Sequence, residues 1–257
     1  MDPITPHRRW QWWHIVLPAT IVMLALVPFD IAIAQLAYVH YPSRTAIKAI
    51  ELAANIAGSG WGVLILAVAA ILVDPKRWTR LPLLVTSSLG AGILVDIAKL
   101  CVARTRPHSV DDLASATFLS TFNGLFPLFS AGSTGQSFPS GHTATAAGMA
   151  VALAFMFPRG RWLFFLMALG VGASRVIVHA HFPTDVAAGF ILGVIWAWMC
   201  HSAMCAPAFA WSERKLTNIA ARYKNHQRAK AAASSQSNAT PATRGPSLQG
   251  PDHRNAA

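Results

Sequence analysis

The chain has 257 residues, of which 54% are hydrophobic and only 12% are charged, and its mean hydropathy is +0.42. Soluble domains carry roughly 25% charged residues, so this composition excludes an ordinary soluble protein and indicates a membrane protein. The formal net charge of +11 lies mostly between and after apolar segments, with no basic face that could read bases, so we expect no nucleic-acid partner.

Six apolar segments are long enough, or nearly so, to cross a bilayer, which takes about 20 residues. They cover residues 14–37, 53–73, 81–98, 142–158, 162–176 and 185–205. Glycines recur in these segments, and small residues let membrane helices approach closely. The sequence therefore predicts an all-α, polytopic membrane protein, a bundle of six transmembrane helices.

The first segment is similar to a secretory signal peptide, because Arg8 and Arg9 precede it and residues 32–34 read Ala-Ile-Ala. However, Pro28 and Asp30 interrupt the run, and the apolar character resumes after them. We therefore expect a retained first helix. Cleavage is the alternative, and it would leave the rest of the topology unchanged.

The distribution of Lys and Arg predicts the orientation, since these residues gather on the cytoplasmic side. Most of the 21 lie before the first segment, between the second and third, between the fourth and fifth, and after the sixth. Both termini are therefore expected in the cytoplasm, with the chain in the plasma (inner) membrane. The expected parts are a cytoplasmic segment at 1–13, a membrane domain at 14–211 with its core at 50–205, and a basic, largely disordered cytoplasmic tail at 212–257. This tail begins helix-like, and its end is the part that we expect to be disordered.

The outer connection between the third and fourth helices contains an apolar stretch at 113–130. Asn123, Gly124 and Pro127 interrupt it, so it is too broken to span the membrane. We expect an interfacial helix followed by a loop, forming part of a lipid entrance. A plain amphipathic connector is the alternative.

The cysteines do not predict a disulfide. Cys101 lies at the predicted outer surface, whereas Cys200 and Cys205 lie near the inner end of the last helix, about a bilayer thickness away and facing a reducing compartment. His179 and His181 stand two residues apart, but without further clustered ligands they are weak evidence for a metal. We expect no metal and no cofactor.

Three polar stretches contrast with the apolar pattern, and the predicted topology places all three on the outer side. They are K-L-C-V-A-R-T-R-P at 99–107, P-S-G-H at 139–142 and S-R-V-I-V-H-A-H-F-P-T-D at 174–185. Charged residues at membrane depth are costly and usually functional. Their shared location therefore indicates one functional site.

Cations in these stretches predict a phosphate site. Lys99, Arg106 and Arg175 would repel one another unless an anion joined them, and guanidinium groups match phosphate oxygens well. Ser140 and Gly141 begin the fourth helix, whose N-terminus offers unbonded N–H groups and a positive dipole end. Together these parts would form a cup for a phosphate group.

Histidines next to this cup supply candidate chemistry. His181 lies four residues before Asp185, and a carboxylate that orients an imidazole makes it a better nucleophile. His142 could then protonate the leaving oxygen. Each of the three stretches also has a simpler explanation. Lys99 could pair with Asp96, and P-S-G-H could be a helix cap. His181 and Asp185 could form a purely structural hydrogen bond.

These three stretches resemble the signature of the type-2 phosphatidic acid phosphatase superfamily, which includes bacterial membrane lipid phosphatases and the vanadium haloperoxidases. The signature reads K-x6-R-P, then P-S-G-H, then S-R-x5-H-x3-D. Every position is matched, in order, by Lys99, Arg106, Pro107, Pro139, Ser140, Gly141, His142, Ser174, Arg175, His181 and Asp185.

The resemblance implies a metal-independent phosphatase with its site at the extracytoplasmic face. In it His181 would attack phosphorus to form a phosphohistidine, Asp185 would orient His181, and His142 would protonate the leaving group and then activate water. The groups implied to bind phosphoryl oxygens are Lys99, Arg106, Ser140, Gly141 and Arg175, with Pro107, Pro139 and Ser174 in supporting positions.

The resemblance also implies a lipid phosphate substrate drawn from the bilayer. Undecaprenyl pyrophosphate is the first choice, and phosphatidylglycerol phosphate, phosphatidic acid and lipid A are alternatives. A lipid phosphotransferase would use the same site. A vanadium haloperoxidase would normally be soluble. A transporter is the non-enzyme alternative, but its charges should be spread along the spans. The sequence does not predict the oligomeric state.

Overall fold

The computed structural model describes residues 13–40, 42–128, 132–202 and 206–237. The chain divides into two compact units, residues 1–213 and 214–257, and each is considered by itself. Arg8, Arg9 and Cys205 lie outside the described residues, as does the tail beyond residue 237.

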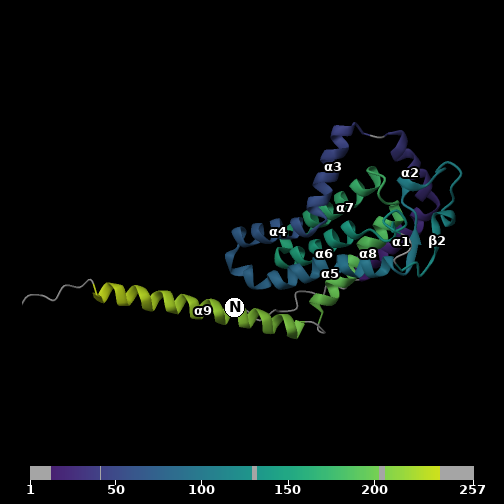
Figure 1. Ribbon diagram of the computed structural model, residues 1–257. Helices are drawn as coiled ribbons and strands as arrows, with labels where there is room; N and C mark the ends of the chain where they lie inside the picture. The colour runs from purple at the N-terminus through teal and green to yellow at the C-terminus, as the bar shows by residue number, and fades with distance from the viewer. Residues whose placement is uncertain (1–12, 41, 129–131, 203–205, 238–257) are drawn as a thin grey trace, which may run out of the picture. The chain divides into compact units, whose positions relative to one another are not determined.

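The first unit is built mainly of helices (Figure 1). Its α-helices are α1 (Trp13–Leu26), α2 (Asp30–Val39), α3 (Arg44–Ala57), α4 (Gly60–Val73), α5 (Leu81–Lys99), α6 (Gly141–Met156), α7 (Arg161–Ile177) and α8 (Pro183–His201), and α9 (Ala206–Ser237) crosses the boundary between the units. Short 3-10 helices are η1 (Val27–Phe29), η2 (Pro75–Arg80), η3 (Pro107–Ser109), η4 (Leu119–Thr121) and η5 (Pro158–Gly160). Two antiparallel strands, β1 (Val102–Arg104) and β2 (Phe122–Leu125), form the described sheet.

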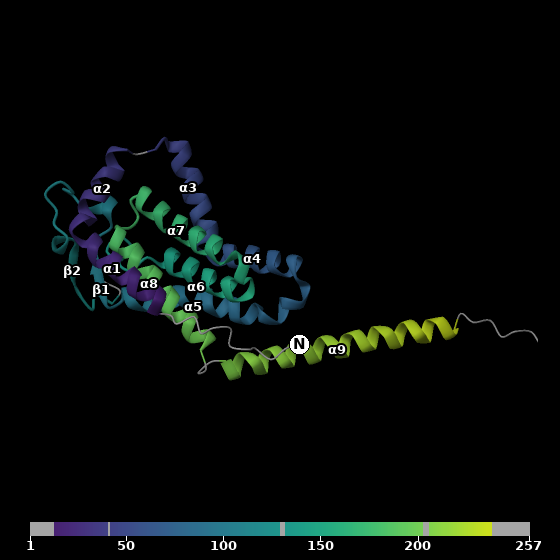
Figure 2. The same ribbon diagram turned by 180° about the vertical axis from the view of Figure 1, so that it is seen from behind.

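Helix α6 is the centre of the bundle, and α5, α7 and α8 pack around it (Figure 2). Small residues permit this packing. A Cβ on Gly148 would lie 2.2 Å from the Ser87 carbonyl oxygen, and a Cβ on Gly193 would lie 2.3 Å from the Ala144 carbonyl oxygen. The backbones of α5 and α8 therefore approach α6 more closely than any larger side chain would permit.

The helices on the outside of the bundle carry large exposed apolar side chains, as lipid-facing helices do. Four helical stretches are long and apolar enough to cross a membrane, namely 13–39, 75–99, 158–177 and 183–201. The bent pair α3 and α4 makes a fifth if it is counted as one span. The chain is thus a multi-pass membrane protein.

Two predicted spans differ from single long helices. The second begins earlier than predicted, at Arg44, and bends by 64° between α3 and α4, where Gly58 and Ser59 interrupt the helix. The fourth, α6, has 16 residues, fewer than the about 20 that a full crossing takes. Each of the six predicted segments contains an α-helix in its described residues, and four or five of these stretches are long enough to span the membrane.

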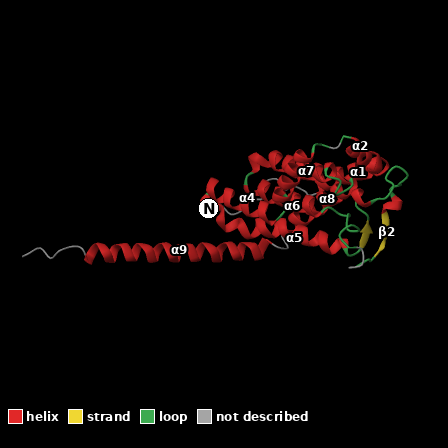
Figure 3. Cartoon of the chain, turned by 45° about the horizontal axis from the view of Figure 1, so that its top comes forward, coloured by secondary structure: helices red, strands yellow, loops and turns green. Residues whose placement is uncertain are grey.

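The predicted interfacial helix at 113–130 is wrong for the described residues 113–128. They contain η4 and β2, and β2 pairs with β1, with Ala103 opposite Gly124. Gly124 adopts a φ of +129°, which breaks a helix and suits a strand irregularity. Figure 3 shows the strands and the long loops gathered at one end of the bundle.

Residues 212–237, the helix-like start of the predicted tail, all belong to α9. This stretch is rich in Ala, Arg, Lys and Gln, which have high helix propensity.

Candidate active site

The three polar stretches, far apart in sequence, meet at one end of the first unit. The Ser140 backbone N–H donates to the Asp185 carbonyl at 3.0 Å, and the Ser137 carbonyl lies 2.7 Å from His181 Nδ1. Lys99 Nζ lies 3.5 Å from the position that a Cβ on Gly141 would take. The ends of α5, α6, α7 and α8 thus converge on one site.

His181 and Asp185 are both buried, in the turn that leads into α8 and in its first turn. Their side chains approach to 3.8 Å between Nδ1 and Oδ2, which is too long for a direct hydrogen bond. The bonded partner of Nδ1 is instead the Ser137 carbonyl. Because a carbonyl only accepts, Nδ1 carries the proton, and Nε2 of the neutral ring keeps its lone pair.

The electrostatic surroundings favour this neutral form. Burial lowers the pKa of His181 below its usual value, the Asp185 carboxylate raises it, and the cations Arg106 and Arg175 lower it again. With a lowered pKa, the imidazole stays unprotonated at neutral pH. An unprotonated Nε2 is what a histidine nucleophile requires.

His142 lies in the first turn of α6 and contacts a residue that the sequence analysis missed, Asn55 of α3. Asn55 Oδ1 lies 3.1 Å from His142 Nε2 and 3.2 Å from a guanidinium nitrogen of Arg175. Arginine can only donate, so the shared Asn55 atom is an oxygen and His142 Nε2 must also donate to it. His142 therefore holds a proton on the nitrogen that faces Asn55.

Two of the three predicted phosphate-binding cations have incompletely bonded guanidinium groups. Within the described chain, the Nε atoms of Arg106 and Arg175 are buried without a hydrogen-bond partner. Burial lowers the pKa of Arg106, and the negative charge of Asp185 raises it. Buried donors of this kind are costly unless a ligand completes them.

Lys99 shows the simpler contact that its spacing allowed. Its Nζ lies 3.0 Å from Asp96 Oδ1, one turn back on α5. Asp96 is 70% exposed, so this pair is solvated and weak, and it can exchange for a better anion. The Lys99 ammonium stays beside Gly141 at the N-terminus of α6.

The N-terminus of α6 is open toward this site. Ser140 is the N-cap residue and is fully buried, but its side chain makes no capping hydrogen bond. Its hydroxyl accepts a hydrogen bond from Thr143 at 3.0 Å. A Cβ on Gly189 would lie 2.3 Å from the Ser140 carbonyl oxygen, so α8 supports this turn from behind. An uncapped helix N-terminus is an anion-binding feature.

The remaining motif residues have other surroundings. The Ser174 hydroxyl donates to the Val171 carbonyl of its own helix, and Pro107 and Pro139 are buried in turns. Among the described residues, no group of three or more His, Cys, Asp or Glu side chains could hold a metal ion.

The sequence analysis also missed Arg104, Ser137 and the role of Asp30. Arg104 occupies an unspecified position of the first motif, yet it is fully buried and contacts Asp30 and Asp185. Ser137 Oγ donates to Asp185 Oδ2 at 2.6 Å. The sequence did show Asp30 as a charge within an apolar segment, which is a usual sign of function.

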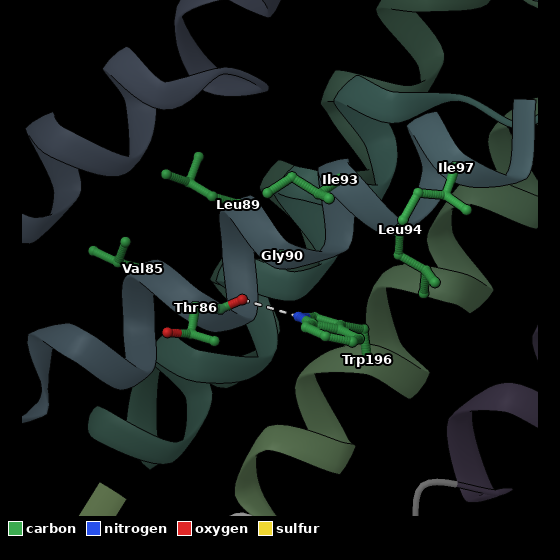
Figure 4. Close-up of a pocket in the computed structure, with 8 residues that line it drawn as sticks. All are labelled: Val85, Thr86, Leu89, Gly90, Ile93, Leu94, Ile97 and Trp196. Carbon is green, nitrogen blue, oxygen red and sulfur yellow. Dashed lines mark hydrogen bonds between the residues drawn. The ribbon is translucent and has the colours of Figure 1, made fainter. Parts of the chain in front are cut away.

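An apolar groove of about 400 Å³ lies along α5 (Figure 4), and none of its lining residues is a residue of the charged site. Its lining residues are Val85, Thr86, Leu89, Gly90, Ile93, Leu94, Ile97 and Trp196. Two residues that are two positions apart on an α-helix are separated by about 200° of rotation about its axis. Ile97 and Lys99 therefore point to nearly opposite sides of α5. The groove therefore does not join the charged site.

Comparison with known proteins places this site in a family. Residues 80–206, which contain all three motifs, match the PAP2 superfamily. Residues 80–206 therefore form a PAP2 superfamily domain. This PAP2 protein is similar to a lipid A 1-phosphatase from Rhizobium etli, with 36% identity over 110 residues that cover 43% of this chain and 44% of the relative.

Two further relatives are similar over longer stretches. An undecaprenyl-diphosphatase from Sulfolobus acidocaldarius is 34% identical over 128 residues, which cover 49% of this PAP2 protein and 56% of the relative. A PAP2-type phosphatidylglycerolphosphate phosphatase from Bacillus subtilis, of known crystal structure, is 21% identical, with a TM-score of 0.48 over 74% of this chain and 94% of that one. The chain thus spans about half the length of the curated relatives that it matches.

Proposed function

We propose that this PAP2 protein is a membrane lipid phosphatase that works through a phosphohistidine on His181. The observation that carries the proposal is the pair of buried, unsatisfied Nε atoms of Arg106 and Arg175 beside a neutral histidine. A phosphate group would satisfy these donors and also the open N-terminus of α6 at Gly141.

In the first step, His181 Nε2 attacks phosphorus while the bond between phosphorus and the leaving oxygen breaks. The proton stays on His181 Nδ1, which donates it to the Ser137 carbonyl, and this hydrogen bond keeps the ring oriented. The positive charge that develops on His181 is stabilised by the Asp185 carboxylate, 3.8 Å away. Lys99, Arg106 and Arg175 neutralise the charge on the phosphoryl oxygens.

His142 supplies the proton. For this step the ring must be the imidazolium, because a neutral ring that lost its Nε2 proton would become an imidazolate. The Nε2–H, which bonds to Asn55 in the free site, would then pass to the leaving oxygen and leave a neutral ring with its proton on Nδ1. The same nitrogen would then accept a proton from the water that attacks the phosphohistidine. Phosphate leaves, and both histidines return to their starting protonation states.

The substrate proposed is a phosphate or pyrophosphate on a lipid of the same bilayer, reached from the extracytoplasmic side. Two similar proteins carry names with different lipids, lipid A and undecaprenyl diphosphate. Undecaprenyl pyrophosphate remains our first choice. The motif residues bind phosphate and do not distinguish the lipid, so the lipid must be found by assay.

The test is phosphate release by the purified, detergent-solubilised protein in the presence of EDTA. The panel holds undecaprenyl pyrophosphate, lipid A, phosphatidylglycerol phosphate, phosphatidic acid and a soluble phosphate ester. His181→Ala runs beside the wild type, and His40→Ala, on the exposed end of α2, is the control. We expect release from one lipid that the first substitution abolishes and the control leaves unchanged. Release that survives His181→Ala would refute the nucleophile, and transfer to an acceptor lipid without release would indicate a phosphotransferase.

A further inference from the structure

A fully buried group of three charges adjoins His181. Its members are Asp30 at the start of α2, Arg104 at the end of β1 and Asp185 in the first turn of α8, each with 0% exposed side chain. The Arg104 guanidinium lies between the two carboxylates. Its two terminal nitrogens meet Asp30 Oδ2 and Asp185 Oδ1, each at 2.5 Å.

Arg104 fixes the orientation of the Asp185 carboxylate. Oδ1 bonds to Arg104, whereas Oδ2 accepts from Ser137 Oγ at 2.6 Å and from the Phe182 backbone N–H at 2.9 Å. Oδ2 is also the oxygen nearest to His181 Nδ1. With separate partners on both oxygens, the carboxylate cannot rotate away from His181 without breaking a charged hydrogen bond.

Asp30 holds Arg104 from the other side and ties it to α8. Its Oδ2 accepts from Arg104 and from Thr184 Oγ1 at 2.7 Å, and its Oδ1 accepts from the Thr184 backbone N–H at 2.9 Å. Thr184 precedes Asp185 in the chain. The first apolar segment is therefore connected, through one carboxylate, to the turn that carries the proposed orienting acid.

Aromatic rings exclude water from the Arg104 guanidinium. The centroids of Phe182, Phe122 and Phe118 lie 4.2, 4.7 and 5.0 Å from its central carbon, and its Nε donates to Thr121 Oγ1 at 3.0 Å. In such surroundings charge pairs act strongly on their neighbours, and an unpaired charge is costly.

Stability alone does not account for this arrangement. The free energy that is needed to remove three charges from water offsets much of their mutual attraction. Apolar side chains of similar volume often give a protein equal or greater stability. The two carboxylates and one guanidinium leave one excess negative charge, and one of the carboxylates, Asp185, faces His181. We propose that Asp30 and Arg104 are positioning residues of the active site, which hold the Asp185 carboxylate in place behind His181. This inference rests on the proposed function.

The experiment compares Arg104→Gln, Asp30→Asn and the double variant that combines them. Arg104→Gln leaves two buried carboxylates without a cation, so we expect a marked loss of thermal stability in detergent. The double variant restores one net negative charge, so its Tm should rise above that of Arg104→Gln. Asp74→Asn, a carboxylate between α4 and η2, is the matched control and should keep wild-type stability and activity.

Kinetics on the lipid that wild type hydrolyses separate positioning from folding. In the double variant we expect kcat to fall about 10- to 100-fold with KM unchanged, because small misplacements of catalytic groups cost up to about that much. A wild-type kcat in the folded double variant would overturn the proposal. A raised KM with unchanged kcat would also overturn it, because Arg104 would then act in substrate binding.

The stability comparison stands independently of activity. If wild type and the Asp74→Asn control release no phosphate from any lipid, the proposed function fails, but the Tm values still test the charge group. A double variant no more stable than Arg104→Gln would show that Asp30 and Arg104 are not coupled, and that result would overturn the inference by itself.

Discussion

At the scale of single residues, the tautomers of the two histidines determine which roles they can take. His181 keeps its proton on Nδ1 because its partner there, the Ser137 carbonyl, only accepts. His142 keeps its proton on Nε2 because it shares the Asn55 oxygen with Arg175. One ring thus presents a lone pair and the other an N–H group, before any substrate binds.

The lowered pKa of His181 predicts the acid limb of the pH–rate profile. The neutral ring is the reactive form, and burial together with Arg106 and Arg175 disfavours the charged ring, against the opposing effect of Asp185. As pH falls, kcat/KM should therefore persist through 6.5, the ordinary histidine value, and decline only at lower pH. An acid limb at or above 6.5 would contradict this account.

Ionisation of the substrate must be separated from that of the enzyme, because a phosphate monoester also titrates near pH 6. A ³¹P NMR titration of the free lipid phosphate provides the control.

The lowered pKa of His181 also has a consequence for stability. The unfolded chain takes up a proton near pH 6.5 while folded His181 does not, so this contribution to stability is present above 6.5 and is lost as pH falls below it.

The motif residues could be predicted from the sequence because their spacing is fixed and their chemistry is shared. Asn55, Ser137 and Arg104 could not, because each acts through partners 44 to 120 positions away and none belongs to a specified motif position. The sequence analysis also expected His181 to bond directly to Asp185, whereas His181 Nδ1 bonds to the backbone carbonyl of Ser137. Residue spacing does not predict a backbone partner of this kind.

At the scale of elements, the central helix depends on glycines in its neighbours. Gly193 of α8 lies against the Ala144 carbonyl of α6, and an added Cβ would be 2.3 Å from that oxygen. By contrast, a Cβ added to Gly170 of α7 would have no neighbouring atom within 4 Å. These two glycines form a matched pair for testing the packing of the bundle.

We predict that Gly193→Ala lowers the free energy of unfolding by about 1–3 kcal/mol, the usual range for overpacking a core. Gly170→Ala should be neutral or stabilising by up to about 1 kcal/mol, because alanine favours the helix. Thermal unfolding in detergent measures both. Equal effects of the two substitutions would show that α8 does not approach α6 as closely as described.

The helices could be predicted from apolar length, but the outer connection could not. Residues 113–128 are apolar enough for an interfacial helix, yet they form η4 and β2, and β2 pairs with β1. Asn123 and Gly124 did indicate a break. The local pattern could not show the partner strand β1, which lies about 20 residues earlier and ends at Arg104. The rings of Phe118 and Phe122 cover the guanidinium of Arg104.

At the scale of the whole molecule, the orientation in the membrane determines which compartment supplies the substrate. The distribution of Lys and Arg predicts an extracytoplasmic site. Cys101, exposed two residues beyond Lys99, reports the side on which the site lies. Arg159, exposed in the connection between α6 and α7, reports the opposite side.

We predict that a variant with Cys200→Ala and Cys205→Ala, which keeps Cys101, reacts with a membrane-impermeant maleimide in intact cells. Adding Cys101→Ser should abolish labelling. Adding Arg159→Cys to that cysteine-free chain should allow labelling only after the cells are permeabilised, because this connection is predicted to face the cytoplasm. The reverse pattern would place the site inside the cell, and only lipids of the cytoplasmic leaflet could then reach His181.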